Sequence, residues 1–492
     1  EKLQEFLSKE TGEDKKEDKK EEDTQGAPAN GADGDIQIVS VTNQNYDEAL
    51  QKQVDDNASK RSYATVPGVR LNKLIVPYKE YVKDFAKDDA KLSPTEKEEL
   101  QKCKDKTKKF MDESSSVVNY LVKEFEMKKN AQLHARSTIS KTGIIDPLKL
   151  HSYKYAEDIF KKMSSIPNQK NHGMMFLLDW SGSMQRNLMP TTEQLLNLVM
   201  FCRKINIPFS VYKFLNNASA GYSYSERMAN KMKSHPDSPF ITDSKTLQPD
   251  QTTRLVQLFT HKQSKSDFKR CAENLHRSAM YFSDYGYRGR YGDPDHIDVP
   301  RITNKYYLSS TPLNEAFIAM DPMIAKFRKD YKTDKVALVT LTDGSANSIS
   351  SVDGGQLMIK LNNRYKKCDY SFRGDGKDLT YHLLQNLKKK YDLQTIGFFL
   401  VKKYNDLRYT FNVPYAKEAL ARKMFTRDKF IADYGTGYDV YYYVKSDTKV
   451  VNKVYDDTAT VKKSQLKRMF MSGMKKRLES RVLLQNFIKR VA

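Results

Sequence analysis

FLLDWSGSM, residues 176–184, joins an apolar run to a polar turn. The run ends in Asp179, Ser181 and Ser183, which are spaced two residues apart. We expect residues 174–178 to form a buried strand that carries the Asp179 carboxylate to its carboxyl end, with a turn that points both hydroxyls toward the same place. Oxygen ligands of this kind suit Mg²⁺ or Mn²⁺ far better than Zn²⁺.

Two later segments supply further oxygen ligands. SSTPL, residues 309–313, opens an amphipathic segment, so Thr311 lies where an N-cap or a metal-facing hydroxyl is expected. Residues 335–341 form a second apolar strand that is followed closely by Asp343. Because the carboxyl ends of neighbouring parallel strands meet at one crevice, we expect Asp179 and Asp343 to face a common ion.

A simpler interpretation of Asp179, Ser181 and Ser183 is a turn in which the aspartate caps backbone amides. The three residues alone do not distinguish the two interpretations. The metal site is favoured because an apolar strand precedes them, and because Thr311 and Asp343 follow in order.

Residues 172–446 alternate short apolar runs with helical segments, which predicts an α/β fold with a mainly parallel sheet and helices on both faces. The predicted strands are 174–179, 208–214, 336–341, 395–401 and 438–444, and clear helices are 192–204 and 379–391.

The chain divides into three predicted regions. Residues 1–45 read as a charged, flexible tail, and 46–165 as a helical domain. The α/β domain spans 166–492, with an insertion at about 216–309 and a basic terminal helix at about 465–492.

Composition limits the classes of function. The chain has 84 Lys and Arg against 62 Asp and Glu, a net charge of +22, which favours acidic partners such as protein carboxylates, nucleic acid or an anionic surface. The four cysteines are widely spaced without a Cys-x-x-Cys pair, so neither a structural zinc nor a disulfide framework is indicated. No apolar run reaches about 18 residues and no signal-peptide pattern opens the sequence, so we expect a cytoplasmic protein without membrane contact.

The insertion holds two further sets of candidate residues. One is a second metal site, for which polar turns in a solvated loop are the alternative: Asp293, Asp295, His296 and Asp298. The other is a group that could stack on single-stranded bases or anchor a protein interface: Tyr285, Tyr287, Arg288, Arg290 and Tyr291.

Motifs of the common catalytic classes are absent from the sequence. It contains no Gly-x-x-x-x-Gly-Lys-Ser/Thr phosphate loop, no His-Glu-x-x-His helix and no Gly-x-Ser-x-Gly elbow. We therefore expect a chain that binds and does not catalyse alone.

At this point the chain resembles the von Willebrand factor A (VWA) domain and its metal-ion-dependent adhesion site (MIDAS). The resemblance implies that Ser181 and Ser183 bind the ion directly, and Thr311 directly or through water. Asp179 and Asp343 would act largely through bound waters. One coordination position is left for an acidic side chain of a partner.

Among VWA proteins the chain is similar to the cobaltochelatase CobT family, including CobT-like proteins of large tailed phages. The likeness rests on the helical leader, on KTGIID at residues 141–146 and on the stretch at 176–184. The chain departs from the family in lacking a long acidic stretch before the VWA domain, and in carrying Trp180 at the variable position of the metal loop.

This likeness implies a subunit that works with a ring-forming AAA+ ATPase of the CobS/MoxR kind and a client offering an acidic residue. The process would be cobalamin biosynthesis, with the chain as an accessory subunit of an ATP-dependent cobaltochelatase-like complex in a bacterial or phage-infected cell. Two alternatives remain open. One is a structural or assembly protein, for example in a virion, and the other is a nucleic-acid-binding protein that uses the basic insertion and terminal helix.

Overall fold

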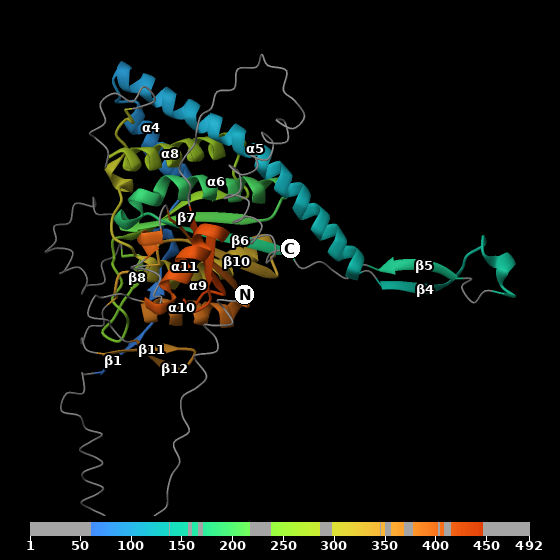
Figure 1. Cartoon of the computed structure of the whole chain (residues 1–492). Coiled ribbons are helices and arrows are strands. Elements are labelled where there is room, and N and C mark those ends of the chain that lie inside the picture. Colours follow the sequence, from blue (N-terminus) through green and yellow to red (C-terminus); the bar gives the residue numbers. More distant parts are fainter. Residues whose placement is uncertain are drawn as a thin grey trace, which may run out of the picture. The chain divides into compact units, whose positions relative to one another are not determined.

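The computed structural model describes most of the middle of the chain, and the described residues all belong to one compact unit, Ser59–Ala492 (Figure 1). They are residues 61–136, 138–155, 160–165, 171–216, 238–285, 298–344, 346–349, 356–368, 377–401, 404–407 and 415–445. The predicted tail at 1–45 and the predicted terminal helix at 465–492 lie outside them.

The centre of this unit is an eight-stranded mixed sheet with the order β14-β15-β13-β10-β6-β7-β9-β3. Neighbouring strands are parallel except for the pairs β14–β15 and β7–β9, which are antiparallel. The strands are β3 (Ile75–Val76), β6 (His172–Asp179), β7 (Phe209–Asn216), β9 (Thr253–Thr260), β10 (Lys335–Leu341), β13 (Gln394–Val401), β14 (Phe430–Asp433) and β15 (Val440–Lys445).

The central strands are buried along almost their whole length. All eight residues of β7 are buried, as are all residues of β6 after His172. Continuous apolar runs are typical of parallel strands that are covered on both faces. For this reason the five strands predicted from the sequence are confirmed to within two residues at each end.

Helices pack in two groups. In the first, α4 (Tyr78–Asp89), α5 (Pro94–Arg136) and α6 (Leu188–Lys204) contact α8 (Lys265–Tyr285). In the second, α9 (Leu313–Tyr331) packs against α10 (Lys377–Tyr391). Figure 1 shows strands of the sheet between the two groups. The predicted α/β class with a mainly parallel sheet is therefore confirmed.

The region at 46–165, which the sequence predicted to be helical, contributes strands as well as helices. β1 (Arg61–Thr65) pairs with β11 (Gln356–Leu361), and β3 pairs with β9 at the edge of the main sheet. The sequence predicted a domain boundary near residue 165. The described residues on both sides of that position belong to the same compact unit. The long helix α5 begins with a capping box, in which the Ser93 hydroxyl accepts from the Glu96 amide at 3.3 Å and Glu96 accepts from the Ser93 amide at 2.8 Å.

The segment interpreted from the sequence as an insertion, 216–309, is in part a component of the main sheet. It supplies β9, which pairs antiparallel with β7, and α8, which packs on α6. β9 was not predicted from the sequence, because that prediction relied on a regular alternation of strands and helices, and an antiparallel strand breaks that alternation. Of the second metal candidates only Asp298 is described, and of the stacking candidates only Tyr285; the others lie outside the described residues.

Smaller elements complete the unit. α5 leads into a hairpin of β4 (Thr138–Ile145) and β5 (Phe160–Ser165), which pair antiparallel (Figure 1). The remaining elements are β2 (Gly68–Val69), β8 (Phe240–Ile241), β12 (Arg364–Cys368), α3 (Leu71–Leu74), α11 (Tyr415–Asp428), η1 (Leu150–Ser152), η2 (Gly182–Asn187), η3 (Asn304–Tyr306) and η4 (Tyr404–Leu407). None of the described helices is long and apolar enough to cross a membrane.

Candidate metal centre

β6, which ends in Asp179, and β10, which ends two residues before Asp343, are neighbours in the sheet. β6 and β10 are parallel, with Leu178 opposite Leu341, so the residues that follow them, Asp179 and Thr342, lie side by side. The Thr342 hydroxyl donates to Asp179 Oδ2 at 2.7 Å and accepts from the Gly344 amide at 3.1 Å. The sheet register thus fixes one oxygen of the Asp179 carboxylate.

Asp179 is a buried carboxylate with an unsatisfied oxygen. Its side chain is fully buried, and Oδ1 has no hydrogen-bond partner among the described residues. Burial, followed by the charge of Asp343, raises the pKa of Asp179 well above its usual range, whereas hydrogen bonds from the Thr342 hydroxyl and from the hydroxyl and backbone amide of Ser181 act in the opposite direction. Asp343 is itself buried, so two carboxyl groups share a site where a cation would stabilise both in their charged forms.

The turn after β6 brings the two predicted serines together. The hydroxyl oxygens of Ser181 and Ser183 lie 3.0 Å apart. Ser181 is buried while Ser183 is exposed, so this pair runs from the interior of the site to its surface. A small ion held by both hydroxyls would therefore be reachable from solvent on the Ser183 side.

Thr311 lies on a segment that is hydrogen-bonded to both aspartate-bearing loops. The Gly182 amide donates to the Ser309 carbonyl at 2.9 Å, and the Asn347 amide donates to the Thr311 carbonyl at 3.0 Å. Thr311 is buried and immediately precedes Pro312, the N-cap of α9. The five predicted ligands therefore lie on three segments that adjoin at one end of the sheet, while their role as ligands stays a prediction.

A polar network beside these segments was missed by sequence reasoning. Asn216, the last residue of β7, donates through Nδ2 to Ser310 Oγ at 2.6 Å and to Asp250 Oδ2 at 3.1 Å. Its backbone carbonyl accepts from the Ser309 hydroxyl at 2.9 Å. The sequence feature that could have predicted this network is an asparagine at the end of an apolar strand. Asn216 is the last residue of β7, as Asp179 is the last residue of β6. The network holds the 309–311 segment in place.

Trp180, between two of the predicted ligands, points into the core. Its indole Nε1 donates to the Tyr306 carbonyl at 2.9 Å. Behind it lies Lys213 of β7, which is fully buried and whose Nζ has no hydrogen-bond partner among the described residues. This Nζ faces the rings of Trp180, Tyr81 and Tyr306 at 4.3, 4.8 and 5.0 Å from their centres. The turn that carries Asp179, Ser181 and Ser183 is thus anchored in the core by Trp180.

The donor set fits a hard divalent cation. Two carboxylates and three hydroxyls offer only oxygen, the ligand type that Mg²⁺ and Mn²⁺ prefer. Within the described ranges, no three His, Cys, Asp or Glu side chains gather to hold a metal ion of any kind, so an ion here would depend on the hydroxyl ligands as well as the two carboxylates. The orphaned Asp179 Oδ1 supports the fit independently, because a buried carboxylate oxygen needs a donor, a water or a cation.

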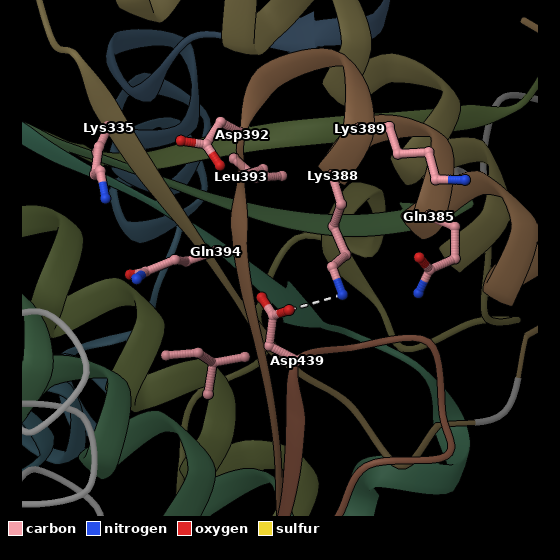
Figure 2. A pocket seen from close by; sticks show the side chains of 9 residues that line it. Lys335, Gln385, Lys388, Lys389, Asp392, Leu393, Gln394 and Asp439 are labelled. Carbon is pink, nitrogen blue, oxygen red and sulfur yellow. Dashed lines mark ion pairs between the residues drawn. The ribbon is translucent and has the colours of Figure 1, made fainter.

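A hollow lies at the opposite end of the sheet from Asp179 (Figure 2). It has a volume of about 540 Å³ and lies beside Lys335 and Gln394, the first residues of β10 and β13. Lys388 and Asp439 point toward each other there, with Nζ 2.7 Å from Oδ1. Ligands of open α/β sheets bind outside the carboxyl ends of the strands, so the site around Asp179 is the stronger candidate.

Comparison with known proteins gives no family. No protein-family model matches the sequence, and no curated protein is similar to it.

Proposed function

We propose that this end of the sheet is a MIDAS-type site, that the fold is of the VWA type, and that the chain is a metal-dependent protein-binding subunit. The observation that carries the proposal is the buried Asp179 carboxyl group, which has one unpaired oxygen, faces Asp343, and adjoins the paired hydroxyls of Ser181 and Ser183.

In this proposal Ser181 and Ser183 hold Mg²⁺ or Mn²⁺ directly, and Thr311 holds it directly or through water. Asp179 and Asp343 accept hydrogen bonds from water bound to the ion and balance its charge. The exposed Ser183 side is where a partner's carboxylate would complete the coordination. Because a partner's side chain takes the open position, no water is activated there and the chain itself is non-catalytic.

The proposed partner is an AAA+ ATPase of the CobS/MoxR kind, with the chain as adaptor between the motor and an acidic client. The cobaltochelatase CobT likeness at residues 141–146 and 176–184 supports this. The net charge of +22 supports an acidic partner, and the absence of a phosphate loop from the sequence is consistent with a separate motor subunit.

Metal binding is tested by calorimetry of Mg²⁺ and Mn²⁺ with wild type, Asp179→Ala and Asp330→Ala. Asp330 is an exposed aspartate of α9 and serves as the matched control. We expect one site in wild type and in Asp330→Ala, and none in Asp179→Ala. Equal binding by all three proteins would refute the site, provided that circular dichroism shows the variants folded.

The partner is tested by affinity purification from the native source, in Mg²⁺ and in EDTA, with wild type and Asp179→Ala. An AAA+ ATPase retained only by wild type in Mg²⁺ supports the adaptor. Recovery of particle proteins alone would favour a structural or assembly role. Recovery of nucleic acid regardless of metal, with affinity that falls steeply with salt, would favour nucleic-acid binding.

A further inference from the structure

The end of β4 and the residues that follow it, up to Tyr155, expose an unusual concentration of large apolar side chains. Leu148 is 83% exposed and Tyr155 is 92% exposed. Four more exposed apolar residues lie within the same twelve positions: Ile144, Ile145, Leu150 and Tyr153. Single exposed apolar residues are normal on a protein surface, but six within twelve consecutive positions indicate an interaction site. We call residues 144–155 the hairpin tip.

The hairpin tip has a defined local shape. The Leu148 amide donates to Asp146 Oδ1 at 3.2 Å, and the Lys149 amide donates to the Asp146 carbonyl at 2.9 Å. The hydroxyl of Ser152, the last residue of the short helix η1, donates to the Lys149 carbonyl at 2.8 Å. The apolar side chains are thus displayed from a hydrogen-bonded turn.

The hairpin itself lacks a core. β4 and β5 form a sheet of two strands, and among the described elements they contact chiefly each other. A two-stranded hairpin is marginally stable in water unless a further layer covers it. A surface that covers the tip would therefore also stabilise the hairpin.

The charges around the tip indicate the kind of surface. Lys149 and Lys154 lie within it, and Lys154 Nζ is 5.9 Å from the centre of the Tyr153 ring. The carboxylate of Asp146 is engaged in the turn. Because each copy of the chain carries a net charge of +22, two copies repel, whereas an acidic partner is attracted.

We propose that the hairpin tip is a docking element for a different, acidic protein, and that its aliphatic and tyrosine side chains enter an apolar cleft rimmed by Asp and Glu. Tyrosines and aliphatic anchors in a cleft, with charges at the rim, are the usual anatomy of a protein interface. The tip shares no residue with the site around Asp179, so the contact is independent of the metal.

The test begins with a photo-crosslinking amino acid, p-benzoylphenylalanine, placed at Tyr155 of the full chain in the native source. Tyr434, which is 50% exposed elsewhere in the unit, is the matched control position. We expect an adduct to a different protein at Tyr155 and not at Tyr434, and we expect it to persist with Asp179→Ala. An adduct of twice the chain mass, an adduct to nucleic acid, or none at Tyr155 would overturn the proposal.

The captured protein is then purified and its affinity measured against the full chain. Leu148→Ser with Tyr155→Ser should weaken binding about tenfold or more, as truncation of interface anchors does, while Tyr434→Ser should not. Lys149→Glu with Lys154→Glu should also weaken it, and added salt should reduce the wild-type affinity. Affinity unchanged in both tip variants, with circular dichroism unaltered, would overturn the proposal even if a crosslink forms. If the full chain binds no metal but still binds the captured protein, the proposed function is contradicted and the docking proposal is supported.

Discussion

Lys213 Nζ lies 4.3 Å from the centre of the Trp180 ring, with no hydrogen-bond partner among the described residues. Trp180 is held between the Asp179 and Ser181 of the candidate site, and Tyr81 of α4 lines the same aromatic cage. The cage therefore joins α4 to the turn after β6 through the buried Lys213 side chain.

The first prediction concerns the cost of burying that ionisable side chain. Burial lowers the pKa of Lys213 well below 10.5, and the three rings offset only part of the lost hydration. Lys213→Met keeps the packing and removes the buried ionisable group, so we expect it to be neutral or to raise the free energy of unfolding by about 1–4 kcal/mol at pH 7.

The same variant has a pH signature. Between the lowered pKa of the folded state and 10.5, the unfolded wild type binds more protons, so wild-type stability rises with pH in that window. The advantage of Lys213→Met should therefore shrink as the pH rises through that window toward 10.5, by at most about 1.4 kcal/mol per pH unit. Urea unfolding at pH 7, 8.5 and 10 measures this difference; a constant difference, or a destabilised variant, contradicts the prediction.

A second prediction concerns Thr342, which no motif singles out. Thr342→Val removes the hydroxyl that donates to Asp179 Oδ2 and accepts from the Gly344 amide. Loss of a residue that orients a ligand typically weakens metal affinity about 10–100-fold, and we expect a loss of that size for Mg²⁺ by calorimetry. Thr333→Val is the control, because Thr333 is buried near the other end of β10 and its hydroxyl has no partner among the described residues. Equal affinity in both variants would show that Thr342 does not orient Asp179.

The sequence alone predicts the central strands, and it predicts that Asp179 lies close to the loop after β10. Apolar runs report burial, and parallel strands align their carboxyl ends. The sequence does not predict the hydrogen bonds of Thr342 and Asn216, because these depend on the strand register and on residues far along the chain. Lys213 shows the limit most clearly: a lysine in a strand normally faces water, and only the aromatic cage explains its burial.

A third prediction concerns the four cysteines, all of which are buried free thiols in the folded unit. Burial raises the pKa of Cys103 to about 11 and that of Cys271 to about 12, so neither forms the reactive thiolate at pH 8. We expect Ellman's reagent to label native protein very slowly at pH 8 and to label four thiols after unfolding in guanidinium. Rapid labelling of any thiol in native protein would show that the core opens locally.

The last prediction links the core to the candidate site through a glycine outside the motif. Gly397 of β13 lies opposite Tyr441 of β15, and a Cβ at Gly397 would lie 2.1 Å from Tyr441 Cδ2. The ring must therefore move in Gly397→Ala. The Tyr441 hydroxyl donates to the Thr342 carbonyl, so this movement leaves a buried carbonyl unpaired beside Asp179.

Overpacking of a core costs about 1–3 kcal/mol, and a buried carbonyl without a partner costs a similar amount. We expect Gly397→Ala to lower the free energy of unfolding by about 2–5 kcal/mol and to weaken Mg²⁺ binding as Thr342→Val does. Gly182→Ala is the control within the metal loop, because the nearest atom to its added Cβ is the Ser309 carbonyl oxygen at 3.9 Å. If Gly397→Ala unfolds more easily in urea but binds Mg²⁺ normally, then Tyr441 supports the sheet and has no part in holding the site.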